Sequence, residues 1–375
     1  MIIIFWVSII LIIYTYIGYP GLIFILRNKF NNKKFTSNKK EKEISVVMIV
    51  CNEEDSIKDK IINIYSQKYD SKKINLIIVD DASDDRTVEY INSLNDERIK
   101  LIKQNKRLGK AAGINNAMKY VHTDLVMLID ARQEISSNAL TDLSSWFFSN
   151  DKTVAVSGEV KFRTEEGNIS GMDAYQAYER NIRISESMIA GVPGVSGAIY
   201  MLKTVLFQPI PENTILDDVL IPMIAAKDGG WIGFDERVIA WDISSNDMKR
   251  EKLRKTRTLN GNYQLLFKHP EWCFPGGHPL WFQFLSHKVL RLLAPFMAIL
   301  LIVLSFSIGY VKNPLVFYIG LSALFVILLY PLSILFPIIN KSSLLRIGTS
   351  FVALNWFNLL GFHQYLFSNR GQSWK

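Results

Sequence analysis

The chain is uncharged over long stretches near both ends, and this feature most strongly limits what it can fold into. No charged residue stands between Ile2 and Leu26, a run made mostly of Ile, Leu, Phe, Tyr and Val. A helix needs about 20 such residues to cross the hydrocarbon core of a bilayer. The run has neither the leading positive charge nor the small-residue cleavage site of a signal peptide. We therefore expect an uncleaved transmembrane anchor over residues 1–27.

A basic segment follows the anchor, and we interpret residues 28–43 as a linker. Positive charge beside a membrane helix favours the cytoplasmic side and an anionic lipid surface, although it also suits a solvated linker. The formal net charge of +8 therefore requires no nucleic-acid partner. Two cysteines are too few for a disulfide framework or a cysteine-rich metal site. The basic residues are Arg27, Lys29, Lys33, Lys34, Lys39, Lys40 and Lys42.

The C-terminal third of the chain is apolar again. Two stretches, Leu292–Val311 and Asn313–Asn340, carry no charge. A third, Ile347–Asn369, is more polar, so it either crosses the membrane or lies at its surface. These patterns predict a multi-pass protein of the inner or plasma membrane with a cytoplasmic middle domain. The expected later segments are an interfacial one at 271–291, a membrane region of two to three helices at 292–369, and a tail at 370–375.

Between these membrane segments, residues 44–270 alternate strand-like and helix-like stretches, which is typical of an α/β sheet. Apolar, β-branched runs of this length suit strands buried on both faces. The predicted strands are Ile44–Cys51, Leu76–Val79, Ile99–Ile102, Leu125–Ile129, Val154–Phe162 and Ala198–Leu202, with Trp231–Trp241 as a final extended segment. The predicted helices are Asn52–Gln67, Arg86–Leu94, Ala111–Tyr120, Ser137–Phe148, Asp217–Lys227 and a basic one at Lys249–Arg257.

Carboxylates follow two of the predicted strands. Asp80 and Asp81, with Asp84 and Asp85 close behind, come after Leu76–Val79, and Asp130 follows Leu125–Ile129. Open α/β sheets bind their ligands at the carboxyl ends of their strands. The alternative is an acidic turn that caps the next helix, because Asp is a favoured N-cap residue.

A basic turn that contains Arg107 and Lys110 lies between these two acidic segments in the sequence. Aspartates beside cations indicate a site for a metal and a phosphorylated ligand. The familiar phosphate motifs are absent: Ala111 follows Gly109-Lys110 where a P-loop has Ser or Thr, and no G-x-G-x-x-G follows the first strand. Five histidines without an HExxH pattern make a zinc centre improbable.

Two further motifs stand in the second half of the block. Glycines within Gly191–Gly197 allow a close backbone approach to a ligand, or form an ordinary turn. Asp217 and Asp218 stand at the start of a predicted apolar helix. Capping that helix needs only one of the two carboxylates, so the other is free to face a cleft. The basic helix at Lys249–Arg257 either lies on lipid headgroups or contacts a diphosphate.

With these motifs in place, the chain resembles the family-2 glycosyltransferases, specifically the membrane-bound bacterial polysaccharide synthases. The matching segments are SVVMIVCNEE at Ser45–Glu54, IIVDDASDD at Ile77–Asp85, RLGKAAGINNAM at Arg107–Met118, LIDAR at Leu128–Arg132, GVSGAIYMLK at Gly194–Lys203 and LDDVLIP at Leu216–Pro222. The resemblance implies an α/β GT-A nucleotide-diphospho-sugar transferase fold, which is a Rossmann-like mixed sheet, with N-terminal and C-terminal transmembrane helices.

The resemblance also implies site roles. Asp218 would be the catalytic base, and Asp130 would stand at the metal-and-diphosphate motif with Mg²⁺ or Mn²⁺. The remaining donor-nucleotide residues would be Asn52, Glu53, Asp80, Asp81 and Lys110. The diphosphate or acceptor group would comprise Arg132, Ser196, Gly197, Asp217, Arg254 and Arg257.

Two motifs depart from the family pattern. The usual D-x-D reads Asp130-Ala131-Arg132, so Arg132 replaces the second carboxylate and could offset phosphate charge. The Q-x-x-R-W motif of processive enzymes keeps only Arg257, with Arg254 where the Gln stands. Stepwise transfer is therefore favoured over processive synthesis.

The expected function is inverting transfer of a hexosyl or N-acetylhexosaminyl group from a nucleotide-diphospho-sugar, first of all a UDP-sugar. The acceptor would be lipid-linked or a growing glycan in cell-surface polysaccharide synthesis. Three alternatives stay open: a processive polysaccharide synthase, a non-catalytic nucleotide-sugar-binding subunit of a synthase complex, and a transporter component. The block of α/β pattern argues against the transporter, because that class does not require it.

Overall fold

The computed structural model describes residues 1–30, 41–163, 174–243, 248–336 and 343–367. The chain divides into two compact units. The sheet unit comprises Leu26–Asn246 and Pro275–Leu280, with the C-terminal residues 370–375. The helical unit comprises Met1–Ile25, Asp247–Phe274 and Trp281–Asn369. Most of the expected linker, 31–40, and the whole tail lie outside the described residues, and the expected domain limits stay predictions.

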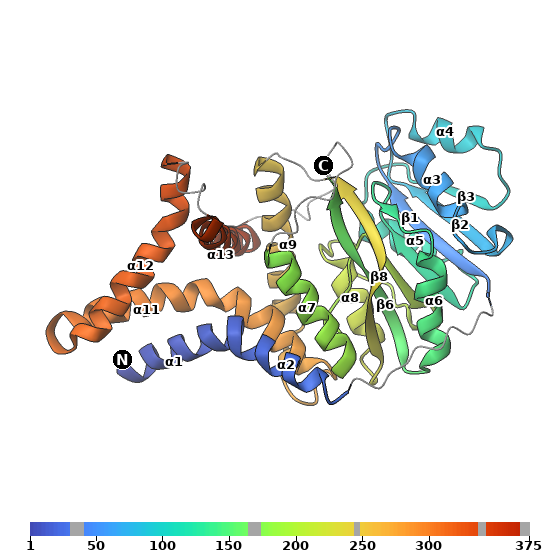
Figure 1. Ribbon diagram of the computed structural model, residues 1–375. Coiled ribbons are helices and arrows are strands. Elements are labelled where there is room, and N and C mark those ends of the chain that lie inside the picture. Colours follow the sequence, from blue (N-terminus) through green and yellow to red (C-terminus); the bar gives the residue numbers. More distant parts are fainter. Residues whose placement is uncertain (31–40, 164–173, 244–247, 337–342, 368–375) are drawn as a thin grey trace. The chain divides into compact units, whose positions relative to one another are not determined.

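The sheet unit is built on one eight-stranded mixed sheet with the strand order β3-β2-β1-β4-β7-β6-β8-β5 (Figure 1). Neighbours from β3 to β4 are parallel, whereas β7 is antiparallel to both β4 and β6. The strands are β1 Ile44–Val50, β2 Ile74–Asp80, β3 Ile99–Lys103, β4 Leu125–Ile129, β5 Glu134–Ile135, β6 Thr153–Arg163, β7 Ile199–Lys203 and β8 Trp231–Ile243.

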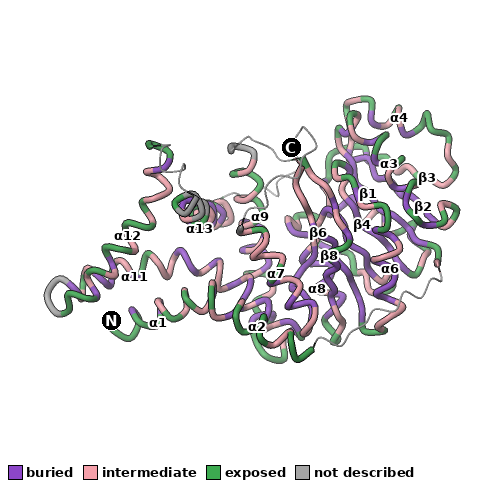
Figure 2. Tube along the Cα trace, viewed as in Figure 1, coloured by how far each residue is buried: buried purple, intermediate pink, exposed green. Residues whose placement is uncertain are grey.

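Helices cover both faces of this sheet. Alternate β1 residues, such as Val46 and Met48, pack in one core with α3 and α6. On the opposite face α5 approaches so closely that a Cβ at Gly113 would lie 2.7 Å from the Ile49 side chain. Strands β1, β2, β4 and β7 are buried along most of their length, whereas the edge strand β3 is not (Figure 2). The helices of this unit are α3 Ile57–Tyr65, α4 Thr87–Ser93, α5 Lys110–Met118, α6 Ala139–Ser149, α7 Ala174–Ile189 and α8 Asp217–Ala225.

Every strand and helix that was predicted between Ile44 and Arg257 is present in the structure, in the predicted order. Three details differ. The helix expected from Asn52 begins only at Ile57, because Asn52 has a left-handed backbone with φ of 56°. The two-residue strand β5, which pairs with β8, was not predicted. Neither was α7, a helix of 16 residues.

The helical unit contains the long apolar helices. Within the described residues, three segments are long and apolar enough to cross a membrane: Ile2–Arg27, Trp281–Gly309 and Pro314–Leu335. Residues Ser343–Phe367 also form a helix, α13, which is not among these three. The helices are α1 Ile2–Ile13, α2 Tyr19–Arg27, α9 Met248–Lys268, α10 Trp281–Gln283, α11 Leu290–Lys312, α12 Pro314–Leu335 and α13.

Polar contacts join these apolar helices. Two π-helical turns, Tyr14–Gly18 and Phe284–Val289, approach each other where Tyr14 Oη lies 3.0 Å from Ser286 Oγ. The buried Tyr263 hydroxyl donates to Asn358 Oδ1 at 2.6 Å, and Asn358 Nδ2 donates to the Arg291 carbonyl at 3.0 Å. Because apolar surroundings provide no alternative partners, such hydrogen bonds fix which helix faces meet.

Candidate active site

The candidate site begins at the edge of the sheet where parallel strands β1, β2 and β4 end. In the register of the sheet Val50 lies beside Asp80, and Met48 lies beside Ile129. The residues that follow each strand, Asn52, Asp81 and Asp130, are therefore brought to one edge. This arrangement was predicted from the strand ends alone.

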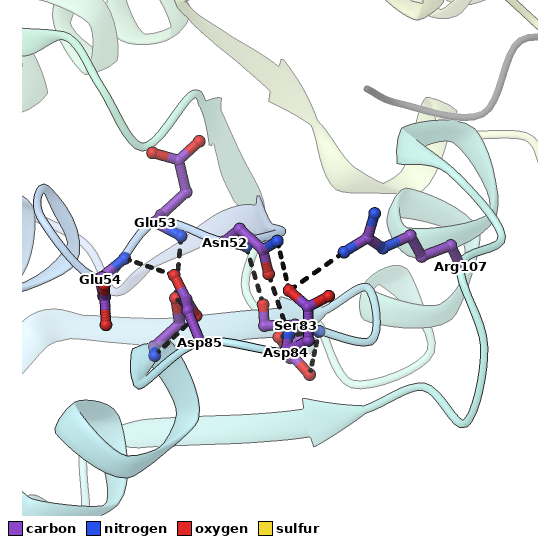
Figure 3. Close-up of polar contacts among 9 residues, drawn as sticks. Asn52, Glu53, Glu54, Ser83, Asp84, Asp85 and Arg107 are labelled. Atoms are coloured by element: carbon purple, nitrogen blue, oxygen red, sulfur yellow. Dashed lines mark hydrogen bonds and ion pairs between the residues drawn. The ribbon is translucent and has the colours of Figure 1, made fainter.

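Asn52 and Asp84 bind each other across two turns (Figure 3). Asn52 Nδ2 donates to Asp84 Oδ1, and the Asp84 amide donates to Asn52 Oδ1 at 3.0 Å. The Asn52 amide donates to Ser83 Oγ at 3.0 Å. Arg107 Nη2 lies 3.4 Å from Asp84 Oδ1. Asp84 therefore does not cap the next helix, and that expectation was wrong.

Asp85 does fulfil the capping expectation. Its carboxylate accepts hydrogen bonds from the Thr87 amide at 2.9 Å and the Glu54 amide at 3.1 Å. Burial tends to raise the pKa of Asp85, but hydrogen bonds from Thr87 and Glu54 hold it below its usual value. Asp85 thus stabilises the start of α4 as an anion.

Asp80 and Asp81 are nearly inaccessible, with exposed fractions of 3% and 1%. Asp80 accepts the Ser83 amide at 3.2 Å. Asp81 accepts the amides of Leu108 at 2.7 Å and Gly109 at 2.9 Å. Asp81 therefore holds the basic turn that precedes α5. A direct nucleoside contact for either aspartate stays a prediction.

Lys110, the first residue of α5, is the centre of the site. Its Nζ lies 2.8 Å from Asp130 Oδ1 and 3.5 Å from Asp217 Oδ2. Burial tends to lower the pKa of Lys110, but the carboxylates of Asp130, Asp217 and Asp218 outweigh it and raise the pKa above its usual value. Lys110 therefore stays a cation at neutral pH, between acids that come from β4 and α8.

Arg132, which replaces the second carboxylate of D-x-D, turns to Glu53. Its Nε donates to Glu53 Oε1 at 2.8 Å and Oε2 at 3.1 Å, while the rest of the Arg132 side chain is largely exposed. Lys60 supports the same loop, with Nζ donating to the Gln133 carbonyl. Burial lowers the pKa of Lys60 to about 8, despite the opposing charges of Asp130 and Glu134.

Asp218 is held by the glycine-rich loop, which consists of residues Gly191–Gly197. The Gly197 amide donates to Asp218 Oδ2 at 3.1 Å, and the Val195 amide donates to the Asp218 carbonyl at 3.0 Å. A Cβ at Gly197 would lie 3.3 Å from Asp218 Oδ2 and 3.4 Å from Lys110 Nζ. The bare backbone of Gly197 thus lines the space between the expected base and the central cation.

Two buried polar atoms beside this cluster make no hydrogen bond within the described residues. They are Asp217 Oδ2 and the hydroxyl of Tyr200, a β7 residue with no exposed surface. Burial raises the pKa of Tyr200, and the negative charges of Asp217, Asp218 and Asp130 raise it further. Buried polar atoms without partners are rare and mark places where a ligand, an ion or water completes the structure.

The predicted site residues of the sheet unit therefore fall into two neighbouring groups. The donor-side group consists of Asn52, Glu53, Asp80, Asp81 and Arg132. The central group consists of Lys110, Asp130, Ser196, Gly197, Asp217 and Asp218. Arg254 and Arg257 belong to α9 in the helical unit, where Arg254 pairs with Glu251 at 2.8 Å. A separate cavity of about 450 Å³, lined by residues such as His122 and Phe148, contains none of these side chains.

Sequence reasoning missed three residues that contact or face the central group: Ser157, Arg183 and Tyr200. Ser157 lies within β6 and outside every motif, whereas Tyr200 lies within the matching segment Gly194–Lys203 but was given no role. Arg183 lies in α7, where Glu179, Arg183 and Glu186 recur at helical spacing on one face. That charge spacing is a signal that could have been used.

A family model described as Glycosyl transferase family 2 matches residues 45–207, a range that contains most of both groups. Residues 45–207 therefore resemble a family 2 glycosyltransferase domain. The poly-beta-1,6-N-acetyl-D-glucosamine synthase of Staphylococcus aureus strain MSSA476 is 26% identical over 246 residues, covering 63% of this chain and 59% of that protein. The Staphylococcus epidermidis synthase of the same name is 23% identical over 265 residues, covering 68% and 64%. The expected family is confirmed, although the chain spans only about three fifths of these relatives.

Among solved structures, the chain is similar to the mannosyltransferase PcManGT from Pyrobaculum calidifontis, solved with GDP-Man and Mn²⁺. The TM-score is 0.74 at 16% identity, and the match covers 98% of this chain and 100% of that one. At this identity the likeness concerns the fold. The GT-A fold of the family 2 domain is confirmed.

Proposed function

We propose that the protein is an inverting glycosyltransferase that moves a sugar from a nucleotide-diphospho-sugar to a hydroxyl of a lipid-linked or glycan acceptor. A UDP-sugar is the first candidate donor, and cell-surface polysaccharide synthesis is the proposed process. The observation that carries this proposal is the convergence of Asp130, Lys110 and Asp218 across a glycine backbone. The names of the staphylococcal relatives support the choice of process.

In the proposed reaction the acceptor oxygen attacks the anomeric carbon as the bond from that carbon to the diphosphate breaks. The nucleoside diphosphate leaves with the bonding electron pair, and the acceptor proton passes to the Asp218 carboxylate. The Gly197 amide orients that carboxylate through Oδ2. Lys110 provides a fixed positive charge within the site, which suits the charge that develops on the leaving diphosphate.

The residues present fit a divalent cation. Mg²⁺ usually takes one or two carboxylates together with substrate phosphates, and both Mg²⁺ and Mn²⁺ prefer oxygen ligands. Asp130 would provide such a ligand, and the fit is supported by the buried Asp217 Oδ2, which makes no hydrogen bond within the described residues and lies 3.5 Å from Lys110 Nζ. Among the described residues no group of three acidic, His or Cys side chains forms a metal cage. When bound, the cation would offset charge on the diphosphate.

Residues 1–27 and the apolar C-terminal helices would keep a lipid-linked acceptor near the sheet unit. This proposal makes the protein multi-pass, with the family 2 domain on the cytoplasmic side of the plasma or inner membrane. It is supported by the three apolar segments and by the basic residues Arg27, Lys29 and Lys42 beside the first of them.

Turnover by the detergent-solubilised full chain tests the function. The donors would be UDP-N-acetylglucosamine, UDP-glucose and GDP-mannose, with nucleoside diphosphate release and product length both measured. Asp218→Asn should lower turnover by about 10²–10⁴-fold, because it removes a general base, while UDP binding is retained. Asp228→Asn, an exposed acid just beyond the same helix, is the matched control.

Each outcome separates the candidate functions. Products of one added sugar support stepwise transfer, and long products support a processive synthase. UDP binding without any release of nucleoside diphosphate would favour a non-catalytic subunit of a synthase complex, for which Asp130-Ala131-Arg132 is the specific argument. Near-normal turnover in Asp218→Asn would show that another group is the base.

A further inference from the structure

Helix α7 places charged residues on the side that packs against the sheet. Glu179, Arg183 and Glu186 are spaced by four and three residues, so they lie on one face of the helix. Glu186 has no exposed surface. The Ser187 hydroxyl accepts the amide of Phe234 in β8 at 2.8 Å, which fixes the helix against that strand. Burying charge is costly, so this face needs a reason beyond simple packing.

Arg183 is the only cation of that trio, and it points to the central group of the site. Its Nη2 donates to Ser157 Oγ at 3.2 Å, and its guanidinium lies 4.6 Å from the centre of the Phe234 ring. Burial lowers the pKa of Arg183, while the charges of Glu186, Glu179, Asp218 and Glu159 oppose that shift. An arginine side chain nevertheless stays protonated in proteins. Arg183 is therefore a permanent positive charge bound to Ser157.

Ser157 connects Arg183 to the glycine-rich loop. Its hydroxyl is fully buried and receives two hydrogen bonds, one from Arg183 Nη2 and one from the Ser196 amide at 2.9 Å. It donates its own proton to the Gly158 carbonyl at 3.0 Å. With two bonds received and one donated, the hydroxyl has no freedom to rotate. The position of Ser196 is thereby tied to the position of Arg183.

The loop passes this constraint on to Asp218. Gly197, the next residue after Ser196, donates its amide to Asp218 Oδ2 at 3.1 Å. Val195, the residue before Ser196, donates its amide to the Asp218 carbonyl at 3.0 Å. The loop therefore holds Asp218 at both its backbone and its carboxylate, and Ser157 holds the middle of that loop.

We propose that Arg183 is a positioning residue for glycosyl transfer: acting through Ser157, it fixes the loop that holds the carboxylate of Asp218. This inference rests on the proposed function, in which Asp218 is the base. Arg183 organises the loop through the hydrogen bond that it donates to Ser157, and both its planar guanidinium and its positive charge contribute to that bond.

Three variants test the two contributions with UDP-N-acetylglucosamine as donor. Arg183→Gln removes charge and geometry, and should lower kcat by about 10²-fold, the scale of a misplaced catalytic group. Ser157→Ala breaks the connection but keeps the charge, so kcat should fall less. Arg183→Lys keeps the charge without the planar fork, and should recover part of the kcat lost in Arg183→Gln. KM for the donor and UDP affinity should stay near wild type in all three.

The split between kcat and KM separates positioning from a purely structural role. Loss of positioning should lower kcat at an unchanged KM for the donor and an unchanged melting temperature, whereas a structural loss should lower the melting temperature as well.

Arg98→Gln is the control, because Arg98, like Arg183, lies over an aromatic ring, 4.0 Å from that of Tyr65, but is remote from the loop and pairs with Asp96. Wild-type kcat in Arg183→Gln would overturn the inference. If Arg183→Gln does not fold, an unchanged kcat in both Ser157→Ala and Arg183→Lys would overturn it equally. If Asp218→Asn retains turnover, the proposed base itself is wrong, and that result is distinct from either of these.

Discussion

Asp81 uses both carboxylate oxygens to accept backbone amides, those of Leu108 and Gly109. Charge-assisted hydrogen bonds of this kind are among the stronger ones in proteins. They place the first turn of α5, and hence Lys110, against Asp130. In the structure Asp81 therefore positions Lys110, and a direct contact of Asp81 with a bound nucleotide stays a prediction.

Asp81→Asn should lower both thermal stability and UDP affinity. The side-chain amide of the asparagine would turn its NH₂ group toward the backbone N–H of either Leu108 or Gly109, so that N–H would lose its acceptor. A buried N–H without an acceptor lowers the free energy of unfolding by about 1–3 kcal/mol. The melting temperature and the UDP dissociation constant of the detergent-solubilised protein measure the two effects.

Asp84→Asn is the control, because the Asp84 side chain is 77% exposed. A weaker UDP affinity in Asp81→Asn at an unchanged melting temperature would instead mean that the carboxylate acts mainly by direct nucleoside contact.

The residues of the candidate site were predictable to different degrees. Asp130 and Lys110 could be placed near each other because both follow strands of one parallel group. The partners of Arg132 and Asp84 could not, since a side chain pairs with whatever the folded turns bring close. Arg183 escaped prediction because its role depends on Ser157, a strand residue 26 positions away.

At the scale of elements, the glycine-rich loop and α8 fit together tightly. Gly194 has φ of +118°, and a Cβ there would lie 2.9 Å from Val219 Cγ2. Gly191 has φ of +121°, and a Cβ there would lie 3.0 Å from the Ile232 amide nitrogen. Both glycines let the loop run between β8 and α8 before it reaches Asp218.

Gly194→Ala should therefore reduce turnover and stability together. The substitution adds backbone strain and forces Val219, with the start of α8, to move. Melting temperature and kcat check the prediction. Gly229→Ala is the matched control, because Gly229 also has a positive φ, +89°, but a Cβ there meets no atom within 4 Å. Equal effects of the two substitutions would contradict a tight contact between the loop and α8.

The strands were easier to predict than α7. Apolar runs such as Leu125–Ile129 are buried on both faces, so composition alone identifies them. In α7 the buried positions include Ser185, Glu186 and Ser187, where an ordinary surface helix has apolar residues. The recurrence of apolar residues every three to four positions, by which a helix is recognised in a sequence, is therefore interrupted on the face of α7 that packs against the sheet.

At the scale of the whole molecule, removal of the proposed divalent cation tests whether turnover requires a metal bound by Asp130. Exhaustive chelation should abolish most turnover, and Mg²⁺ or Mn²⁺ should restore it, because the proposed cation held by Asp130 would offset the negative charge of the leaving diphosphate. Turnover is measured before and after the metal is returned. Zn²⁺ prefers nitrogen and sulfur ligands and is the control ion, expected to restore less. Activity that survives chelation would exclude Asp130 as a metal ligand.

Hydropathy predicted the membrane-spanning candidates because their signal is length and absence of charge. The three segments found, Ile2–Arg27, Trp281–Gly309 and Pro314–Leu335, correspond to the uncharged runs. The third C-terminal helix, α13, was expected to be the most polar, and it is not among the three. The π-helical turns could not be foreseen, because their extra residue is recognised only from hydrogen bonding.

The change from parallel to antiparallel pairing between β4 and β7 has a consequence for how such enzymes can diverge. Residues 44–130 carry all of the donor-side group except Arg132, together with Lys110 and Asp130, and residues 131–243 carry Arg132 with the loop and helix that hold Asp218. In the sheet the two segments meet along the ladder from Leu125 opposite Lys203 to Ile129 opposite Ile199. Backbone hydrogen bonds tolerate changes of side chain. Recombination between the segments that meet at the β4–β7 pairing could therefore exchange the proposed acceptor preference between related chains while residues 44–130 are inherited unchanged.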